Sequence, residues 1–598
     1  MLSKSSNLRS YLLATAIITF LMIVAGYVLR FNPQGQVCPD WPTCYGQLAI
    51  PPSDAARLEM GHRVLAAVSG LMILIAAGWA WQQKRSGFLR ATLTGAVALV
   101  TAGAAVGGSL VFTSSAVLMS ATHLALALAA MGLITAATTA AFYEERLGSR
   151  ILAFNFSAPF ARLTVITAVV VFILMVSGGV TAALQAGQAC SGWPLCNGGL
   201  PQGPIGWLAL AHRVVTLMAG LLAVVLFARA WRTQYQQPVV LAAATAMGML
   251  FAGQVLIGAL KVRDGFPVEL VGLHAAVTAG LWAILAVLMT AAGLTPSSRA
   301  PEGVAALAVR PGGKLRLRAF LMLNKPIIVA LLLVTTYAGM VVGGKEIPGG
   351  WLTFWTLLGG ALAAGGASAL NQYVDRKIDG RMQRTAGRPL PSGVLTPAEG
   401  LAYGLGACLA AFFLLAGFVN LLAAVLSLTG MIYYVLVYSI WLKYATVQNI
   451  VIGGGAGAIP PLVGWAAATG SLNVPALFLF ALVFMWTPPH FWALALVRSK
   501  DYARAGVPML PVVKGEKETR IQIFIYTLEL VGLTLLMPLF KVAGSIFLVS
   551  AIILGVWLIY TAWSVLRNTG NKFAWRMYRY SSMYLAFIFL ALVVDVLV

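Results

Sequence analysis

Seventeen apolar stretches, each long enough to cross a lipid bilayer, constrain the fold of this chain more than any other feature. A spanning helix needs roughly 20 apolar residues, and its backbone has to satisfy its own hydrogen bonds inside the membrane. Only 10% of the 598 residues are charged, against about 25% in soluble domains. We therefore expect an all-α polytopic membrane protein. The expected spans lie near residues 11–30, 59–81, 91–111, 116–141, 162–184, 207–229, 239–260, 269–293, 327–343, 351–370, 399–418, 421–442, 450–469, 476–497, 521–539, 545–566 and 581–598.

A segment rich in Pro, Gly and Arg, residues 295–319, divides these spans into two groups. It is too polar at its ends and too broken to cross a membrane, which is typical of a linker. The sequence thus predicts a domain of eight spans over residues 1–294 and a domain of nine spans over residues 320–598, joined by a cytoplasmic linker.

Basic loops set the expected orientation. Lys and Arg total 40 against 17 Asp and Glu, a net charge of +23, which we attribute to loops on one membrane face rather than to a nucleic-acid partner. With alternating helices, that face and the N-terminus are cytoplasmic and the C-terminus is outside, in the plasma membrane of a prokaryote. No cleavage site follows the first span, so we expect a retained anchor rather than a signal peptide. The loop cations are Lys84, Arg85, Arg90, Arg146, Arg150, Arg229 and Arg232.

An internal repeat is the strongest pattern in the first domain. Both copies contain Trp-Pro-x-Cys followed by His-Arg, and their cysteines and histidines recur at offsets of 150 to 152 residues. The repeat predicts two four-helix bundles related by a pseudo-two-fold axis along the membrane normal. The equivalent pairs are Cys38 and Cys190, Cys44 and Cys196, His62 and His212, and His123 and His274.

The four repeated histidines are candidate haem ligands. Each lies within two turns of the outer end of its expected helix, so all four share one membrane depth. An imidazole in hydrocarbon is costly without a partner, and two imidazoles from neighbouring helices can bind the two faces of haem iron. Histidines that only hydrogen-bond between helices are the alternative, which the symmetry of the four disfavours.

The two cysteine pairs lie in outer loops, where the compartment is oxidising and a short loop turned by Trp-Pro can bring two thiols together. We expect the disulfides Cys38–Cys44 and Cys190–Cys196. They serve either as clamps on loops over the haem sites or, in one copy, as a redox relay. Cys408 lies in an apolar span and is interpreted as inert packing.

Glu59 breaks the symmetry of the repeat, because Ala209 occupies the equivalent position. A carboxylate one helical turn from His62 is expensive at membrane depth and suits proton handling in redox chemistry. The alternative is a helix cap at the membrane interface. The asymmetry indicates one reactive half and one half with an electron-holding haem.

The first domain closely resembles haem A synthase in its eight-helix arrangement, outer cysteine pairs, four histidines and Glu-x-x-His-Arg stretch. The resemblance implies a b-type haem on His212 and His274. It also implies a substrate haem on His62 and His123, with Glu59 as the essential acid. The implied reaction is oxidation of the C8 methyl group of haem O to a formyl group, with an electron donor that the sequence leaves open.

In the second domain, Asn371, Asp375 and Asp379 follow an N-x-x-x-D-x-x-x-D spacing, which places three oxygen ligands on one face of a helix. Carboxylates near a membrane surface suit Mg²⁺, which leaves coordination positions for phosphate oxygens. Arg384 and Arg388 follow, and guanidinium groups can bind phosphate through two donors. A solvated helix end is the usual explanation for a single D-x-x-x-D.

A second polar loop carries Lys500 and Asp501 on the same expected side of the membrane. Two acidic loops on one side of a bundle that is otherwise almost free of acids favour a functional site over solvated helix ends. We expect the two loops to face each other and to bind a metal ion and a phosphate compound.

The second domain resembles the protohaem farnesyltransferase, or haem O synthase, branch of the intramembrane aromatic prenyltransferases. The motifs that carry the resemblance are Asn324-Lys-Pro, Asn371 to Asp379, Arg384 to Leu390, Tyr438 to Lys443, NIVIGGGAGAIPPLVG (449–464), WTPPHFW (486–492) and Asp501 to Val513. The implied Mg²⁺ ligands are Asn371, Asp375, Asp379 and Asp501, and the implied diphosphate ligands are Lys325, Arg384, Arg388, Lys443 and Lys500. One Mg²⁺ is better supported than two, because the second motif supplies one aspartate where the wider superfamily has a pair. His490 is a candidate haem ligand or proton acceptor, with packing as the alternative.

Together the two resemblances imply conversion of haem B to haem O with farnesyl diphosphate, and of haem O to haem A, on one chain. The rival interpretation is a di-haem electron-transfer protein fused to a prenyltransferase that acts on a quinone precursor, and Glu59 argues against it. Membrane lipid, an unidentified electron donor, cytochrome oxidase assembly factors and a second copy of the chain are further candidate partners. We assign no role to Glu529 or Asp595 beyond hydrogen bonds between helices.

Overall fold

The protein is built from helices that are long and apolar enough to cross a membrane. Seventeen such helices occur in the described residues, as the sequence predicts, and the same residues contain no strand. The chain divides into two compact units, unit 1 (residues 1–306) and unit 2 (residues 307–598). The predicted all-α membrane fold is confirmed. The computed structural model describes residues 5–30, 37–48, 51, 53–113, 117–147, 154–196, 199–294 and 312–598.

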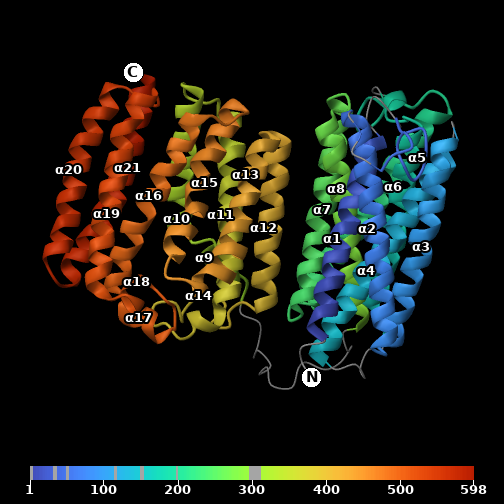
Figure 1. The fold of residues 1–598 in the computed structure, drawn as a ribbon, viewed down its shortest axis with the longest axis horizontal. Helices are drawn as coiled ribbons and strands as arrows, with labels where there is room; N and C mark the ends of the chain where they lie inside the picture. Colours follow the sequence, from blue (N-terminus) through green and yellow to red (C-terminus); the bar gives the residue numbers. More distant parts are fainter. Residues whose placement is uncertain are drawn as a thin grey trace. The chain divides into compact units, whose positions relative to one another are not determined.

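The helices of unit 1, coloured from blue to green in Figure 1, form two four-helix bundles by their contacts. Its helices are α1 (Ser5–Arg30), α2 (Asp54–Gln82), α3 (Gly87–Phe112), α4 (Val117–Leu147), α5 (Pro159–Ala183), α6 (Pro204–Thr233), α7 (Pro238–Arg263) and α8 (Val268–Leu294). In the first bundle α1 and α3 each pack on α2 and α4, and in the second α5 and α7 each pack on α6 and α8. Contacts of α8 with α1 and α4 join the bundles, and the indole N–H of Trp282 donates to the Leu128 carbonyl across this join at 2.6 Å.

The starts of the even-numbered helices set the depth of the repeated histidines. The Ser53 side chain caps α2 by accepting a hydrogen bond from the backbone N–H of Ala56, and a proline begins α6. His62 and His212 each lie eight residues after the first residue of their helix. Because an α-helix rises 1.5 Å per residue, equal spacing from equivalent starts gives the two copies the same geometry.

Unit 2 contains nine spanning helices and several short elements among its described residues. They are α9 (Gly313–Leu323), α10 (Pro326–Gly344), α11 (Gly350–Asp379), α12 (Pro397–Phe418), α13 (Leu421–Ile432), the π-helix η3 (Tyr433–Leu442), α14 (Lys443–Ala445), α15 (Asn449–Thr469), α16 (Val474–Val497), α17 (Ser499–Arg504), α18 (Leu510–Val513), α19 (Gly515–Leu536), η4 (Met537–Phe540), α20 (Ser545–Arg567) and α21 (Asn571–Leu597). Consecutive long helices alternate in direction, so the segments that follow α11, α13 and α16 leave the bundle at the same end, where Figure 1 shows α14, α17 and α18.

The start of unit 2 differs from the sequence expectation. Residues 313–319, assigned to the linker, belong to α9, which packs on α11 and α12. Arg316 of α9 pairs with the buried Glu399 at 2.6 Å, and Ala319 is buried. A short basic helix has the low hydropathy of a loop. Its tertiary contacts, which a hydropathy profile does not detect, stabilise it. The other linker residues, 295–311, lie outside the described residues.

The span expected over residues 421–442 consists of an α-helix followed by a π-helix. The α-helical part ends at Ile432 and the π-helix η3 continues to Leu442. Within η3 the Ser439 hydroxyl donates to the carbonyl of Tyr434, five residues earlier, at 2.8 Å. Apolar composition does not distinguish π from α geometry, so the sequence did not reveal this change. Such segments are frequent at functional sites, and this one leads directly into Lys443.

Asp595 makes a contact of the kind expected from the sequence. Its carboxylate accepts hydrogen bonds from the backbone N–H groups of Gly544 and Phe547, the latter at 3.0 Å. Asp595 therefore joins α21 to the first turn of α20, where a negative charge is favourable.

Candidate active sites

The predicted substrate-haem ligands, His62 of α2 and His123 of α4, lie next to each other in the first bundle. Their ring centroids are 6.3 Å apart and their planes are inclined by 76°. Two imidazoles on opposite sides of one metal need about this separation, because a metal–nitrogen bond is about 2 Å long and each ring centre lies roughly 1 Å behind its nitrogen. Nδ1 of His62 is 3.1 Å from the Met22 carbonyl, and that of His123 is 2.8 Å from the Gly103 carbonyl. These bonds orient the rings so that Nε2 is the nitrogen left for a metal.

His212 and His274 line a large cavity in the second bundle. The cavity has a volume of about 1390 Å³, beyond the range of roughly 300–1,000 Å³ that is usual for small-molecule sites. Nδ1 of His212 is 2.9 Å from the Ser177 hydroxyl, whereas the buried Nδ1 of His274 has no hydrogen-bond partner within the described ranges. Buried polar atoms nearly always have a partner. The cavity and the orphaned nitrogen therefore fit a haem site.

A glycine of the preceding helix lies against each of the four histidines. A side chain at any of these positions would press on an imidazole carbon, so glycine sets how closely the backbone approaches the ring. These glycines were not among the residues predicted from the sequence, although they recur at offsets of 152 and 151 residues, as the cysteines and histidines do. The distances from an added Cβ to the imidazole Cε1 are 2.6 Å for Gly26 and His62, 2.7 Å for Gly107 and His123, 3.1 Å for Gly178 and His212, and 3.3 Å for Gly258 and His274.

Glu59 is buried, and its carboxylate is bonded to the loop of the first disulfide. It accepts hydrogen bonds from the backbone N–H groups of Val37 and Cys38 at 2.9 and 3.1 Å, and it pairs with Arg63 at 2.6 Å. The N-cap of α2 is Ser53 rather than Glu59, so the helix-cap interpretation of Glu59 does not describe this carboxylate. Its role in proton transfer stays a prediction.

Each predicted disulfide is present in the structure. Cys38 and Cys44 are bonded with their Cα atoms 4.9 Å apart, and Cys190 and Cys196 with theirs 4.5 Å apart. Cys408 is a buried free thiol, as expected for a packing residue.

The arginine after the first histidine of each copy anchors the disulfide loop. Arg63 donates to the Asp40 carbonyl at 2.7 Å. Arg213 donates to the carbonyls of Gly192 and Cys190, both at 2.7 Å. In the His-Arg motif, a candidate metal ligand is therefore followed directly by the residue that holds the disulfide loop. Both copies of the repeat contain the arginine, but its spacing alone does not predict this contact.

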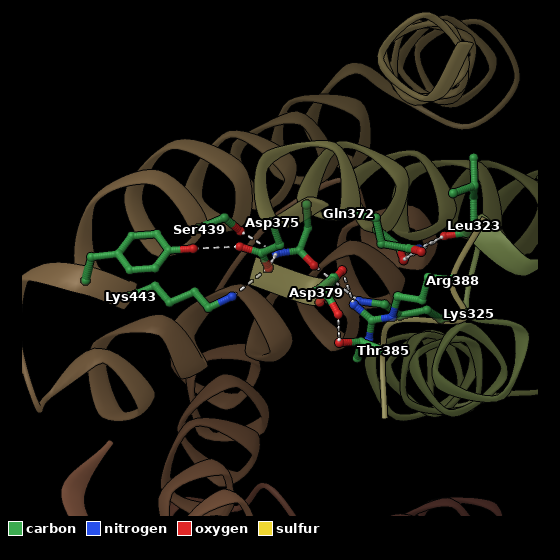
Figure 2. A network of polar contacts seen from close by, with 12 residues as sticks. Leu323, Lys325, Gln372, Asp375, Asp379, Thr385, Arg388, Ser439 and Lys443 are labelled. Atoms are coloured by element: carbon green, nitrogen blue, oxygen red, sulfur yellow. Dashed lines mark hydrogen bonds and ion pairs between the residues drawn. The ribbon is translucent and has the colours of Figure 1, made fainter. Parts of the chain in front are cut away.

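Asp375 is the centre of a polar network near the end of α11 (Figure 2). Its carboxylate accepts hydrogen bonds from the Asn371 amide and the Tyr444 hydroxyl, both at 2.9 Å, and pairs with Lys443 at 2.6 Å. The Asn371 amide also donates to the Ser439 hydroxyl at 3.0 Å. Asp375 is only 4% exposed, and a buried charge requires such partners.

Asp379 lies one helical turn further along and pairs with Arg388 at 2.7 Å. The Thr385 hydroxyl donates to its backbone carbonyl at 2.9 Å, and the Lys325 ammonium donates to the side-chain oxygen of Asn371 at 3.3 Å (Figure 2). Burial, and after it the nearby charge of Arg388, lowers the pKa of Lys325 to about 8. Two carboxylates, an amide oxygen and several cations thus meet at one point, a donor set that fits Mg²⁺ and a diphosphate.

Asp501 lies in the short helix α17, between two arginines that pair with it. It pairs with Arg504 at 2.8 Å and with Arg498 at 4.0 Å. In the part of the chain that the structure describes, no group of three or more His, Cys, Asp or Glu side chains is close enough to hold a metal ion. Lys500 and Arg384 are exposed. A metal site shared by Asp501 and the α11 aspartates stays a prediction.

His490 lies between two aromatic rings of unit 2. Its ring centroid is 4.2 Å from that of Trp486 and 4.5 Å from that of Tyr578, both stacked. Nδ1 is 2.9 Å from the Ser581 hydroxyl. These contacts favour the packing interpretation of His490 over the haem-ligand interpretation.

Three members of the α11 network were not predicted from the sequence. Gln372 donates to the Leu323 carbonyl at 2.8 Å and so ties α11 to the turn that carries Lys325. Ser439 lies in the π-helix and Tyr444 follows it, and neither position can be deduced from apolar periodicity. For Gln372, the signal was a second amide beside Asn371 in an otherwise apolar span.

Two family models match the chain, one in each unit. The model described as "Cytochrome oxidase assembly protein" matches residues 9–286, and the model described as "UbiA prenyltransferase family" matches residues 332–589. A protoheme IX farnesyltransferase of Chloroflexus aurantiacus is 35% identical over 604 residues, which cover 99% of each chain. One of Roseiflexus sp. (strain RS-1) is 41% identical over 522 residues, which cover 84% of this chain and 94% of the relative.

The chain belongs to the protohaem IX farnesyltransferase family. The Asp375 network of this farnesyltransferase lies inside the region matched by the prenyltransferase model, and all four repeated histidines lie inside the region matched by the other model. The predicted fusion of the two families is confirmed. A solved UbiA homolog from Archaeoglobus fulgidus, described as bound to GPP and Mg²⁺, is 17% identical and covers 46% of this chain and 99% of that chain, with a TM-score of 0.36.

Proposed function

We propose that this farnesyltransferase makes haem A from haem B in two steps. Unit 2 transfers the farnesyl group of farnesyl diphosphate to a vinyl group of haem B, and water completes the addition to give haem O. Unit 1 oxidises the C8 methyl group of haem O to a formyl group by successive hydroxylations and loss of water, with molecular oxygen as the oxidant and an external electron donor as the co-reductant. The observation that carries the proposal is that one chain holds a carboxylate and cation cluster in unit 2 and two imidazole pairs in unit 1. Only the first pair has a carboxylate three residues before one of its histidines, Glu59 before His62, where the second copy has Ala209 before His212.

The buried residues of unit 2 divide the work on the diphosphate. Asn371, Asp375 and Asp379 supply oxygen ligands for Mg²⁺. When bound, Mg²⁺ neutralises the diphosphate so that it leaves more readily. Lys325 and Arg388 donate to its oxygens, and the surrounding apolar helices exclude water from the farnesyl cation until the vinyl carbon attacks.

The remaining polar residues near this site act at its entrance. Lys443 pairs with Asp375 and holds this carboxylate in position. Arg384, Lys500 and Asp501 lie in the segments at the same end of the bundle, from which they approach the diphosphate and its metal ion as the substrate enters.

In unit 1 the two histidine pairs take different roles. His62 and His123 hold haem O as the substrate, and Glu59 accepts a proton near its reacting edge. His212 and His274 hold a b-type haem, which supplies electrons when bound. The buried ion pair of Glu59 and Arg63, with 2% and 10% side-chain exposure, supports this division, because the second copy has Ala209 in place of the acid.

We place the N-terminus and the segment between the units in the cytoplasm and the C-terminus outside, in the plasma membrane of a prokaryote. The basic loops of unit 1 support this orientation. Farnesyl diphosphate and haem B then enter unit 2 from the cytoplasmic side. An electron donor, cytochrome oxidase assembly factors and a second copy of the chain are the candidate protein partners.

The proposal is tested by expressing the chain in bacterial cells that lack their own haem O and haem A synthases. Pigments are extracted, separated and identified by mass spectrometry, and cells that carry the empty vector are the control. We expect both haem O and haem A in aerated cells. A farnesylated quinone without haem O would overturn the assignment of unit 2. Haem O without haem A would overturn that of unit 1 and favour a di-haem electron-transfer domain.

A further inference from the structure

Lys261 places a cation in the cavity of the second bundle. It lies near the outer end of α7 and lines the same cavity as His212 and His274. Its ammonium group is 5.9 Å from the ring centre of Phe266, and no carboxylate pairs with it within the described ranges of the chain. A charge at this depth without an anionic partner is costly, so Lys261 is not explained by the protein's own contacts.

The position of Lys261 on α7 aims it at the site of the histidine pair. Gly258, one turn earlier on the same helix, lies against the ring of His274, with 3.3 Å between an added Cβ and the imidazole Cε1. Residues three apart share a helix face, and both Gly258 and Lys261 line the cavity. A lysine that only extended toward the membrane surface would not need to lie on this face.

Arg213, the other cation of this cavity, is already engaged. Its guanidinium donates to the carbonyl groups of Gly192 and Cys190, both at 2.7 Å, and to that of Pro194 at 3.0 Å. These bonds hold the disulfide loop. Lys261 is therefore the cation of the cavity whose donors are left for a ligand.

The first bundle has no lysine at the equivalent place. Gly107 lies against His123 as Gly258 lies against His274, an offset of 151 residues, and the same offset relates Lys261 to Leu110. The equivalent of Arg213 is Arg63, which is paired with Glu59. The two sites therefore differ in charge as well as in the acid.

We propose that Lys261 binds a propionate carboxylate of the haem held by His212 and His274, and that this contact makes the haem resident. The inference rests on the proposed haem site of the second bundle. An iron porphyrin carries two propionates, and a partly buried ammonium group binds a carboxylate by a charge-assisted hydrogen bond. The first bundle, with Leu110, lacks this anchor, which suits a site whose haem arrives as substrate and leaves as product.

The test uses the full chain purified in lipid nanodiscs, with His62→Ala so that the second bundle holds the haem that is measured. Lys261→Gln should release this haem to apomyoglobin roughly ten times faster or more, since it removes a charge-assisted hydrogen bond to the propionate. It should also lower the midpoint potential, because a positive charge near the iron is removed. Lys261→Arg should restore both values. Arg263→Gln is the matched control, because Arg263 lies two residues away and pairs with Asp264 at 2.6 Å; both values should stay unchanged.

Unchanged release and potential in Lys261→Gln would overturn the inference. If Lys261→Gln does not fold, Leu110→Lys in the otherwise native chain tests the same proposal. The added lysine should slow the release of hemin from the first site. An unchanged release rate would contradict the proposal. A native chain that binds no haem on paired histidines, as judged from its absorption spectrum after hemin is supplied, would instead overturn the proposed function itself.

Discussion

The carboxylate of Glu59 and the guanidinium of Arg63 are 2.6 Å apart, and both are bonded to the loop closed by the first disulfide. In the second copy, Arg213 is the equivalent of Arg63, and its guanidinium donates to the Cys190 carbonyl at 2.7 Å rather than to an acid. The first copy thus has an ion pair, one turn from His62, where the second copy has a hydrogen bond to its own loop. The two copies therefore differ in charge beside their disulfide loops.

Replacing Glu59 by Gln should retain haem and stop the oxidation step. Loss of an acid–base group typically costs 10²–10⁴-fold in rate, so haem A formation should fall by at least about 100-fold while haem O accumulates. Pigment analysis and the absorption spectrum of the purified variant measure the two effects. Glu145→Gln is the matched control, because Glu145 pairs with Arg9 at 2.7 Å on the surface of the same bundle. Normal haem A formation by Glu59→Gln would remove Glu59 from the reaction.

The glycines behind the histidines predict a graded effect of alanine. A methyl group at Gly26 would lie 2.6 Å from the His62 ring, whereas one at Gly258 would lie 3.3 Å from the His274 ring. Overpacking costs about 1–3 kcal/mol, so Gly26→Ala should weaken haem binding at its site by roughly 5–150-fold. Gly258→Ala should have the smaller effect. Hemin titration with detection of the low-spin haem spectrum measures both, and the opposite ranking would contradict the geometry.

Asp375 should be essential for farnesyl transfer. Asp375→Asn removes a metal-binding charge and leaves Lys443 without its buried partner, so the rate of haem O formation should fall by at least about 100-fold, as for loss of other transition-state charge stabilisers. Chelation of Mg²⁺ should have the same effect, reversed by added Mg²⁺. The rate is measured with purified protein, haem B and farnesyl diphosphate.

Glu516→Gln is the control for Asp375→Asn, because the Glu516 side chain is 60% exposed and pairs with Arg520 at 2.8 Å. It should retain normal activity. Full activity of Asp375→Asn in the presence of a chelator would exclude the proposed metal site.

The first disulfide loop should loosen in acid. The hydrogen bond from the Thr43 hydroxyl, followed by bonds from the backbone N–H groups of Gly46 and Tyr45, lowers the pKa of Asp40 below its usual value of 3.8. Because the folded pKa is the lower one, the stabilisation is present above about 3.9 and is lost as the pH falls through the folded pKa. The protection factors against amide exchange of Tyr45 and Gly46, whose nitrogens are 2.7 and 2.8 Å from the carboxylate, should therefore fall as the pH drops below about 3.9. Asp40→Asn should abolish the pH dependence, and a dependence that persists in this variant would assign it to another group.

The sequence predicted the spans because a transmembrane helix is specified by composition over about 20 residues. It also predicted that His62 would meet His123, since the repeat and the helix count place them at one depth in one bundle. Both inferences need only local patterns and chain alternation, and the ring separation of 6.3 Å agrees with them.

The contacts of Glu59 and Tyr444 could not be predicted in the same way. Glu59 binds backbone groups of a loop that is more than 20 residues away in the chain. Tyr444, which follows a π-helix, donates to Asp375 of another helix. Such contacts depend on tertiary geometry that neither hydropathy nor spacing encodes. The α9 helix was missed for the same reason, because Arg316 finds its partner, Glu399, in a different helix.

Pigments from cells that lack their own haem O and haem A synthases show whether unit 2 supplies the substrate of unit 1. Asp375→Asn should yield neither haem O nor haem A, whereas His123→Ala should yield haem O without haem A, each with the variant present at the level of the native chain. Haem A in the Asp375→Asn cells, or absence of haem O in the His123→Ala cells, would contradict the account.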